Sequence, residues 1–200
     1  MERAAEILEF WFGQRDDAGW DFDPARYELW FGRSQETDRL IIERFGADAQ
    51  AAAEGVLDSW TATPETRMAL VLLLDQFPRH IHRGKPEAWA QDPKAQKIVL
   101  EGLELGHDQA LRPIERSFFY LPLEHAEDRE LQARSVELYQ RLAAAAPASV
   151  KDRYDSFLRY AERHKEIVDR FGHFPHRNRI LGRPSTDEEE AFLLEPNSSF

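Results

Sequence analysis

Apolar residues recur at spacings of three and four along most of the chain, which is the period of an α-helix. No segment alternates apolar and polar residues for long, so the pattern predicts no β-sheet. We expect an all-α fold of antiparallel helical hairpins, with about eight to ten helices in a single domain, residues 1–200. The expected helices lie near 24–31, 64–77, 93–105, 113–120, 127–145 and 149–171, and a last one starts at Ser185.

Three of these helices begin in the same way, with a polar residue followed by proline. Asp23, Thr63 and Asp92 are expected to be N-caps, each with a proline as the first helical residue. Pro78 is expected to end the second of these helices, because proline disfavours helical backbone at the residue before it.

One predicted helix has no polar face between Met68 and Leu74, the longest apolar run in the chain. We expect it to lie at the centre with other helices around it, and it is far too short to span a bilayer. The last helix can start at either of two overlapping capping boxes, Ser185 to Glu188 or Thr186 to Glu189.

Composition narrows the possible partners. The chain has 37 acidic and 26 basic residues and a net charge of −11, so its overall field repels nucleic acid and anionic membranes, and we expect neither as a partner. Cysteine is absent, which excludes thiol catalysis and disulfides. Glu2, Arg3 and Glu9 interrupt any apolar stretch long enough to be the core of a signal peptide. We therefore expect a cytoplasmic protein.

Familiar catalytic signatures are missing from the sequence, but three polar clusters remain. The chain contains no P-loop, G-x-G-x-x-G, G-x-S-x-G or H-E-x-x-H motif. The clusters are Asp75 to Arg79, Glu124-His125 and His176 to Asn178, and each adjoins proline and aromatic residues at a predicted helix end. His164 lies on the apolar face of the longest helix, where it is either a buried structural histidine or part of a pocket lining.

Each cluster also has a structural interpretation. Asp75 and Arg79 could join two helices, and the acids near His125 could cap the next helix. The cations between 170 and 183 could stabilise a helix C-terminus. If an anion binds in this segment, we expect it at His176, Arg177 and Arg179, because four acids already occupy the first turn of the following helix.

A metal site is a weaker hypothesis, and we expect no metal or other cofactor. His173 and His176 form a His-x-x-His motif, but Pro175 between them prevents the regular helix that would bring both side chains to one face. The pair His107-Asp108 resembles that of the HD-type metal phosphohydrolases. It follows Gly106 at a predicted helix end, however, and not the interior of an apolar helix.

Aromatic residues are concentrated near the N-terminus, where they either fill the core or line a groove for a flat or peptide ligand. These residues are Phe10, Trp11, Phe12, Trp20, Phe22, Tyr27, Trp30 and Phe31.

Several long phrases together resemble one bacterial family. They are "ILEFWFG", "LLLDQFPRHIHRG", "FFYLPLEHAED" and "YAERHKEIVDRFGHFPHRNRILGRPSTDEE", and the resemblance runs from about residue 6 to residue 194. The family is the domain of unknown function (DUF) family 924, and the resemblance implies a tetratricopeptide-like helical fold without an established activity. The family motifs match Asp75 to Arg79, Leu121 to His125 and Phe174 to Asn178. His173 departs from the pattern, because the family more typically has arginine there, which cannot bind a metal.

The leading hypothesis is a pocket where the three clusters converge and a small anionic molecule binds. His125 or His176 would be the acid or base, Glu124 or Asp75 would orient it, and Arg79 and Arg177 would stabilise charge. The residues expected to be catalytic are Glu124, His125 and His176, and those expected to bind the ligand are Asp75, Arg79, His164, Arg177 and Asn178. The alternative is a tetratricopeptide-like scaffold that binds a peptide or protein, in which every polar cluster is structural. A metal-dependent hydrolase is the weaker alternative.

Overall fold

The computed structural model describes residues 2–14, 19–21, 24–196 and 198–199, and the elements in these ranges are all helical. Ten of their α-helices have six or more residues. The α-helices are α1 (Glu2–Phe12), α2 (Ala25–Phe31), α3 (Gln35–Ala53), α4 (Pro64–Leu74), α5 (Gln76–Ile81), α6 (Asp92–Glu104), α7 (Pro113–Phe119), α8 (Leu121–Glu124), α9 (Arg129–Ala145), α10 (Lys151–Phe171), α11 (Asn178–Leu181) and α12 (Asp187–Phe192). Short 3-10 helices are η1 (Asp58–Ala62), η2 (Pro86–Trp89), η3 (His107–Ala110) and η4 (Pro175–Arg177).

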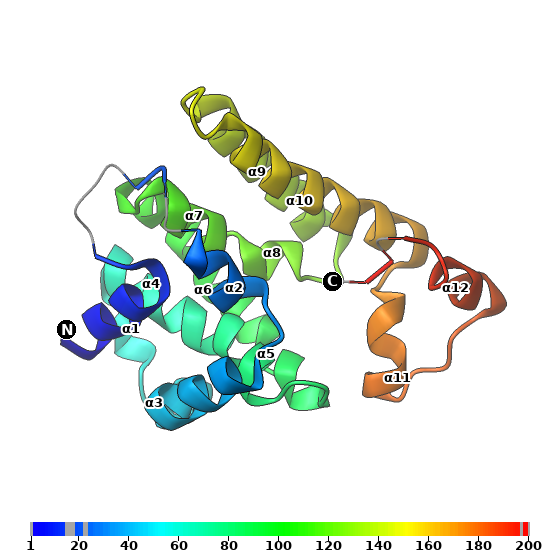
Figure 1. Ribbon diagram of the computed structural model, residues 1–200, viewed down its shortest axis with the longest axis horizontal. Coiled ribbons are helices and arrows are strands. Elements are labelled where there is room, and N and C mark those ends of the chain that lie inside the picture. Colours follow the sequence, from blue (N-terminus) through cyan, green and yellow to red (C-terminus); the bar gives the residue numbers. More distant parts are fainter. Residues whose placement is uncertain (1, 15–18, 22–23, 197, 200) are drawn as a thin grey trace.

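Helix α4 lies at the centre, as its lack of a polar face predicts. Thr63 caps it by accepting a hydrogen bond from the Thr66 amide, and every side chain from Met68 to Leu74 is fully buried. Helices α1, α3, α6 and α7 pack around it. The side chains from Met68 to Leu74 all belong to the main hydrophobic core, and Figure 1 shows α4 among α1, α6 and α7.

The helix that ends at Asp75 ends earlier than the sequence predicts, and the prediction that Pro78 ends it is wrong. Asp75 closes α4, and Pro78 lies in the first turn of the next helix, α5. The first turn tolerates proline, because the amide groups of that turn have no partner within the helix. From this second helix, Arg79 donates hydrogen bonds to Asp92 of α6.

Other predicted helix ends are partly confirmed. The expected N-cap Asp92 is wrong, because Gln91 occupies that position and Asp92 is the first helical residue. The expected start of the last helix at Ser185 is wrong, because the helix uses the second capping box, with Thr186 as N-cap and Glu189 as its partner. The expected cap Asp23 lies outside the described residues.

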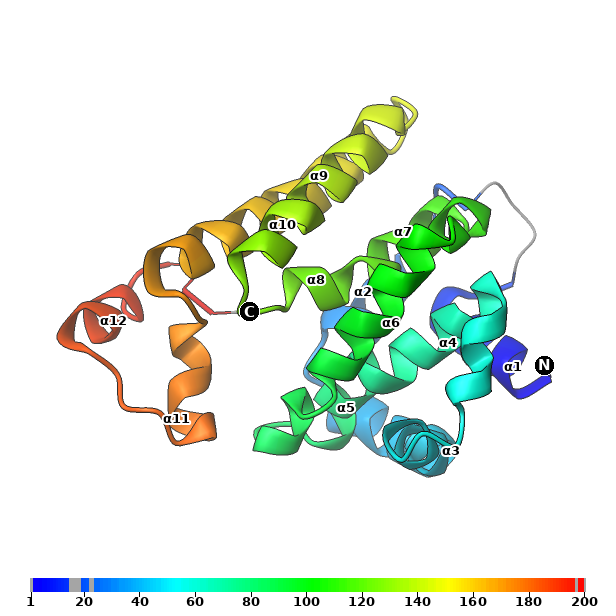
Figure 2. The ribbon, with the colours of Figure 1, turned by 180° about the vertical axis from the view of Figure 1, so that it is seen from behind.

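The C-terminal half consists of a long antiparallel pair and a small addition at its end. Helices α9 and α10 lie side by side, and Arg129 at the start of α9 donates a hydrogen bond to the Asp169 carbonyl near the end of α10 at 3.0 Å. Gly172 ends α10 in the left-handed region, with φ of 79°. Helices α11 and α12 then lie at the opposite end of the molecule from α1 and α3 (Figure 2).

Within the described ranges, no helix combines the length and the apolar character that a membrane span requires.

Candidate functional site

A large cavity of about 1030 Å³ lies where the two halves meet. Its lining comes from α2, α5, η2, α7, α8, α9, α10, η4 and α11, so both halves of the chain contribute. Six of the predicted site residues line it, namely Arg79, Glu124, His125, His164, His176 and Arg177. The three polar clusters, which lie about 50 residues apart along the chain, therefore meet in one place.

Arg79 of α5 lines the base of the cavity, and Asp75, at the junction of α4 and α5, lies behind it and outside the lining. Asp75 is fully buried, and its Oδ1 lies 3.3 Å from Nη2 of Arg79. The same guanidinium donates two hydrogen bonds of 3.0 Å to the carboxylate of Asp92 on α6. Burial opposes the charge of Asp75, but the positive charge of Arg79 and the contact with His125 more than compensate, and the pKa of Asp75 is lowered. Asp75 therefore stays ionised behind the cavity wall.

His125 is oriented by Asp75 and not by its sequence neighbour Glu124. Its Nδ1 lies 2.8 Å from Oδ1 of Asp75, so Nδ1 carries the proton and Nε2 is the basic nitrogen. Burial, only partly offset by Asp75, lowers the pKa of His125, so the ring is neutral near pH 7. A neutral imidazole held by a buried carboxylate is a proton acceptor for a group in the cavity.

Glu124 points to a different partner, because consecutive residues of a helical turn diverge by about 100°. Its Oε1 lies 3.2 Å from Nδ1 of His164, which also donates a 2.8 Å hydrogen bond to the Tyr160 carbonyl. Burial and then the negative charge of Asp75 raise the pKa of Glu124 to about 8, and a hydrogen bond with Tyr139 offsets part of this. Burial also lowers the pKa of His164, so this pair is neutral near pH 7.

The raised pKa of Glu124 predicts a specific pH dependence. Folding raises this pKa from 4.5 to about 8, so the protonated form stabilises the folded state fully below pH 4.5, and this stability is lost as the pH rises toward 8. The free energy of unfolding should therefore fall between pH 7 and pH 8, by up to about 1.4 kcal/mol per pH unit. Urea titrations at both pH values measure the fall, and Glu124→Gln, which cannot ionise, should remove most of it. Equal falls in the two proteins would contradict this assignment.

Arg177 is the most unusual side chain in the cavity, because its charge is buried and only partly paired. The residue is 6% exposed, and its Nη1 donates one hydrogen bond, to the His125 carbonyl at 3.1 Å. Its nearest carboxylate, Asp92, is 3.8 Å away and already bound to Arg79, and among the described residues Nε of Arg177 has no acceptor. Burial and then Arg79 lower the pKa of Arg177 to about 10, so the guanidinium is still charged at neutral pH.

His176 lies in the cavity, whereas His173 does not. Burial and then the charge of Arg177 lower the pKa of His176 to about 4, and its ring packs against Phe174 with centroids 5.6 Å apart. His173 pairs instead with Glu189 at 2.6 Å, outside the lining. The His-x-x-His motif therefore does not converge, and no group of three or more potential metal ligands occurs among the described residues.

Asn178 and Arg179, which the sequence predicts to lie beside Arg177 at the site, do not line the cavity. Asn178 is buried, but its amide contacts Ser185 and Glu189, and its Oδ1 accepts a hydrogen bond from Arg183 at 2.9 Å. It holds α11 to the C-terminal segment and does not line the cavity. Arg179 is exposed and also outside the lining, so the expectation that it joins His176 and Arg177 at an anion site is wrong.

Several residues of the site escaped sequence analysis. Asp92 pairs with Arg79, whereas the proline that follows it in the sequence predicts only a capping role. Trp89 lies 5.6 Å from the Arg177 guanidinium, and Tyr139 reaches the site from α9. None of these carries a local signal, since each depends on contacts between segments distant in the chain.

One wall of the cavity is aromatic. Some of the N-terminal aromatic residues therefore fill the core, and others line the cavity. Trp11 and Phe12 are buried in the core, whereas Tyr27 and Phe31 are about half exposed and line the cavity. Trp30 does both, being 4% exposed and part of the lining. Phe22 lies outside the described residues.

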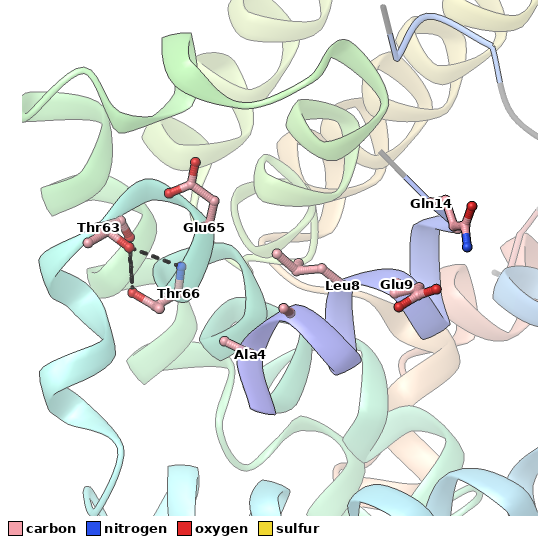
Figure 3. Close-up of a pocket in the computed structure, with 9 residues that line it drawn as sticks. Ala4, Leu8, Glu9, Gln14, Thr63, Glu65 and Thr66 are labelled. Carbon is pink, nitrogen blue, oxygen red and sulfur yellow. Dashed lines mark hydrogen bonds between the residues drawn. The ribbon is translucent and has the colours of Figure 1, made fainter. Parts of the chain in front are cut away.

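A second, smaller hollow of about 580 Å³ lies between α1 and the start of α4. Figure 3 shows Ala4 and Leu8 of α1 beside Thr63 and Thr66, which are hydrogen-bonded to each other. Among the described residues, its lining contains two glutamates and neither a cation nor a histidine. This hollow therefore lacks the arginines and histidines that line the large cavity.

Comparisons with known proteins agree with this fold. The model of a family described as a bacterial protein of unknown function (DUF924) matches residues 7–197. A solved structure of a protein of unknown function from Agrobacterium tumefaciens is 41% identical, with 96% of each chain covered and a TM-score of 0.80. No curated protein matches the chain.

Proposed function

The chain belongs to the DUF924 family of bacterial proteins of unknown function, and we propose that it binds a small anionic molecule in its large cavity. One observation carries the proposal: Arg177 is a buried cation in the lining, and Nε of its guanidinium lacks an acceptor among the described residues. Burial of an incompletely paired charge is costly, and an anionic ligand would offset that cost.

The distribution of charge around the cavity supports the proposal. Among the described residues, the lining contains six arginines, at positions 33, 79, 83, 153, 159 and 177, and two acids, Glu124 and Asp152. Glu124 is protonated near pH 7 because its pKa is about 8. The carboxylates that balance Arg79 and Arg83, namely Asp75, Asp92 and Asp38, lie behind the lining. A ligand would meet N–H donors, although the chain as a whole carries a net charge of −11.

The same site would suit proton transfer to or from the bound molecule. In this proposal His125, held by Asp75, accepts a proton at Nε2, and protonated Glu124 is the donor. His176 is neutral and beside Arg177, so it would contact the ligand as a hydrogen-bonding group. Arg79 and Arg177 would hold the anion, with His164 beneath them.

A peptide-binding scaffold remains the alternative function, and the half-exposed aromatic wall favours it. In such a scaffold Arg177 would be structural, held by the His125 carbonyl and by Asp92, and would need no anionic ligand. The binding of a small anion therefore separates the two functions.

Isothermal titration with inorganic phosphate tests the proposal. We expect phosphate to bind at one site per chain, and Arg177→Gln to weaken the affinity at least tenfold, because charge-assisted hydrogen bonds to an anion contribute about 1.5–3 kcal/mol. Arg177→Lys should bind with intermediate affinity, because it keeps the charge and loses the planar fork.

The matched control is Arg179→Gln, which removes an exposed arginine two residues away, outside the lining, and should leave the affinity unchanged. His125→Asn should stay within about threefold of the wild type, since proton transfer, and not anchoring, is its proposed role. Absence of saturable binding, or an equal loss in the two glutamine variants, would overturn the proposal.

A further inference from the structure

We infer that the molecule bound in the large cavity is amphipathic, with its anionic group at Arg79 and Arg177 and an apolar body along the aromatic wall of α2 and α10. This inference rests on the proposed function and adds the class of ligand to it. The class is a carboxylate that carries an acyl chain or an aromatic ring.

The aromatic wall is apolar surface that folding leaves uncovered. Tyr27, Phe31 and Tyr160 are 50%, 46% and 49% exposed, and all three line the cavity. The rings of Tyr27 and Phe31 lie 4.9 Å apart, and those of Phe31 and Phe118 are stacked at 6.1 Å. Exposed large apolar side chains that gather in one concave place are typical of a binding site.

Helices α2 and α10 both contribute aromatic residues to this wall. Tyr27 and Phe31 come from α2 and Tyr160 comes from α10, and all three line the same cavity. An apolar group between the helices would contact aromatic side chains on both sides.

Helix α10 connects the apolar wall to the polar base. Phe157, Tyr160 and His164 follow one another at spacings of three and four, and all three line the cavity. With a rise of 1.5 Å per residue, Phe157 and His164 are separated by about 10 Å along the helix axis. His164 contacts Glu124 at the polar base, so the lining changes from aromatic to polar over about the length of a short acyl chain.

Other charged residues of the wall lie at the rim. Arg153 is paired with Asp21, and Asp152 and Arg159 are exposed. Of the lining arginines in the described part of the chain, Arg177 alone is buried, with 6% of its surface exposed. The buried cation is the stronger site for the anionic group because water competes with it least.

Calorimetric titration with three probes separates the contributions of the two parts of the ligand. Octanoate carries both parts, acetate carries only the carboxylate, and 1-octanol carries only the chain. Each buried methylene strengthens binding about fourfold. We therefore expect octanoate to bind at one site per chain, at least tenfold more tightly than acetate or 1-octanol.

Variants assign the two parts to the two ends of the cavity. Tyr160→Ala alters an exposed position on a helix surface, so the protein should remain folded. It should weaken octanoate at least fivefold and leave phosphate unchanged. Leu105→Ala, at a residue that is 64% exposed and outside the lining, is the matched control and should change neither. Arg177→Gln should weaken both ligands, whereas Arg179→Gln, at an exposed residue outside the lining, should weaken neither.

The outcomes distinguish the amphipathic ligand from the proposed function, which is the binding of a small anion. Phosphate binding with octanoate no tighter than acetate overturns the amphipathic ligand and keeps the anion site. Loss of octanoate binding in Arg159→Gln but not in Arg177→Gln overturns the proposed orientation. Failure of every probe, phosphate included, overturns both proposals.

Discussion

Replacing Asp75 by asparagine is expected to lower the free energy of unfolding by about 3–5 kcal/mol, because it removes the fully buried carboxylate of the Asp75–Arg79 ion pair. Asp75 is fully buried, and it contacts Arg79 at 3.3 Å, His125 at 2.8 Å and Gln76 at 2.5 Å. Asparagine has nearly the same shape, so the loss would report the charge and not a cavity. The lowered pKa of Asp75 means that the folded state favours the ionised carboxylate, so removal of this charge is expected to destabilise the fold.

Urea denaturation at pH 7 measures this loss. Asp152→Asn is the matched control, because Asp152 also adjoins the cavity but is exposed, and its effect should stay within about 0.5 kcal/mol. If the two variants lose the same stability, the ion pairs at the base of the cavity are not structural. Binding can be tested separately, since a variant destabilised by this amount can still be mostly folded at low temperature.

Replacing Phe77 by alanine is expected to be as damaging, with a loss of about 3–5 kcal/mol. Phe77 is fully buried, and its ring lies 5.3 Å from Trp11 and 5.2 Å from Phe45. Truncation leaves a cavity where α1, α3 and α5 meet. Because Phe77 lies on α5 between Asp75 and Arg79, the change should also loosen the base of the binding site.

Chemical denaturation of a second phenylalanine variant provides the comparison. Phe31 is 46% exposed and lines the cavity, so Phe31→Ala should cost about 1 kcal/mol or less. The two substitutions remove the same atoms, and the difference between them measures burial alone. Similar losses would mean that Phe31 belongs to the core and not to a ligand-binding wall.

Local signals accounted for much of the fold. The apolar run from Met68 to Leu74 predicts a central helix, because a helix without a polar face has no side that is suited to contact with water. Gly172 and Thr186 mark helix ends correctly for similarly local reasons, a left-handed conformation and a capping hydroxyl. Pro78 misled because its effect depends on whether it stands in the first turn or the interior of a helix.

The candidate site shows the limit of such signals. Glu124 and His125 are neighbours in sequence, which suggested an acid–base pair, yet each binds a partner about 40 to 50 residues away. Asn178 belongs to a motif with Arg177 but turns toward the C-terminal segment. The direction of a side chain on a short helix follows from its angular position, and its partner follows from packing.

The sequence by itself determined the all-α class, the central helix and the residue types of three polar clusters, because helical period and capping are local properties of the chain. Tertiary structure alone decided that these clusters meet in one cavity, that Asp75 and not Glu124 orients His125, and that Arg177 is buried. Distance, dielectric environment and charge pairing arise from contacts between segments far apart in the chain, and no local pattern encodes them.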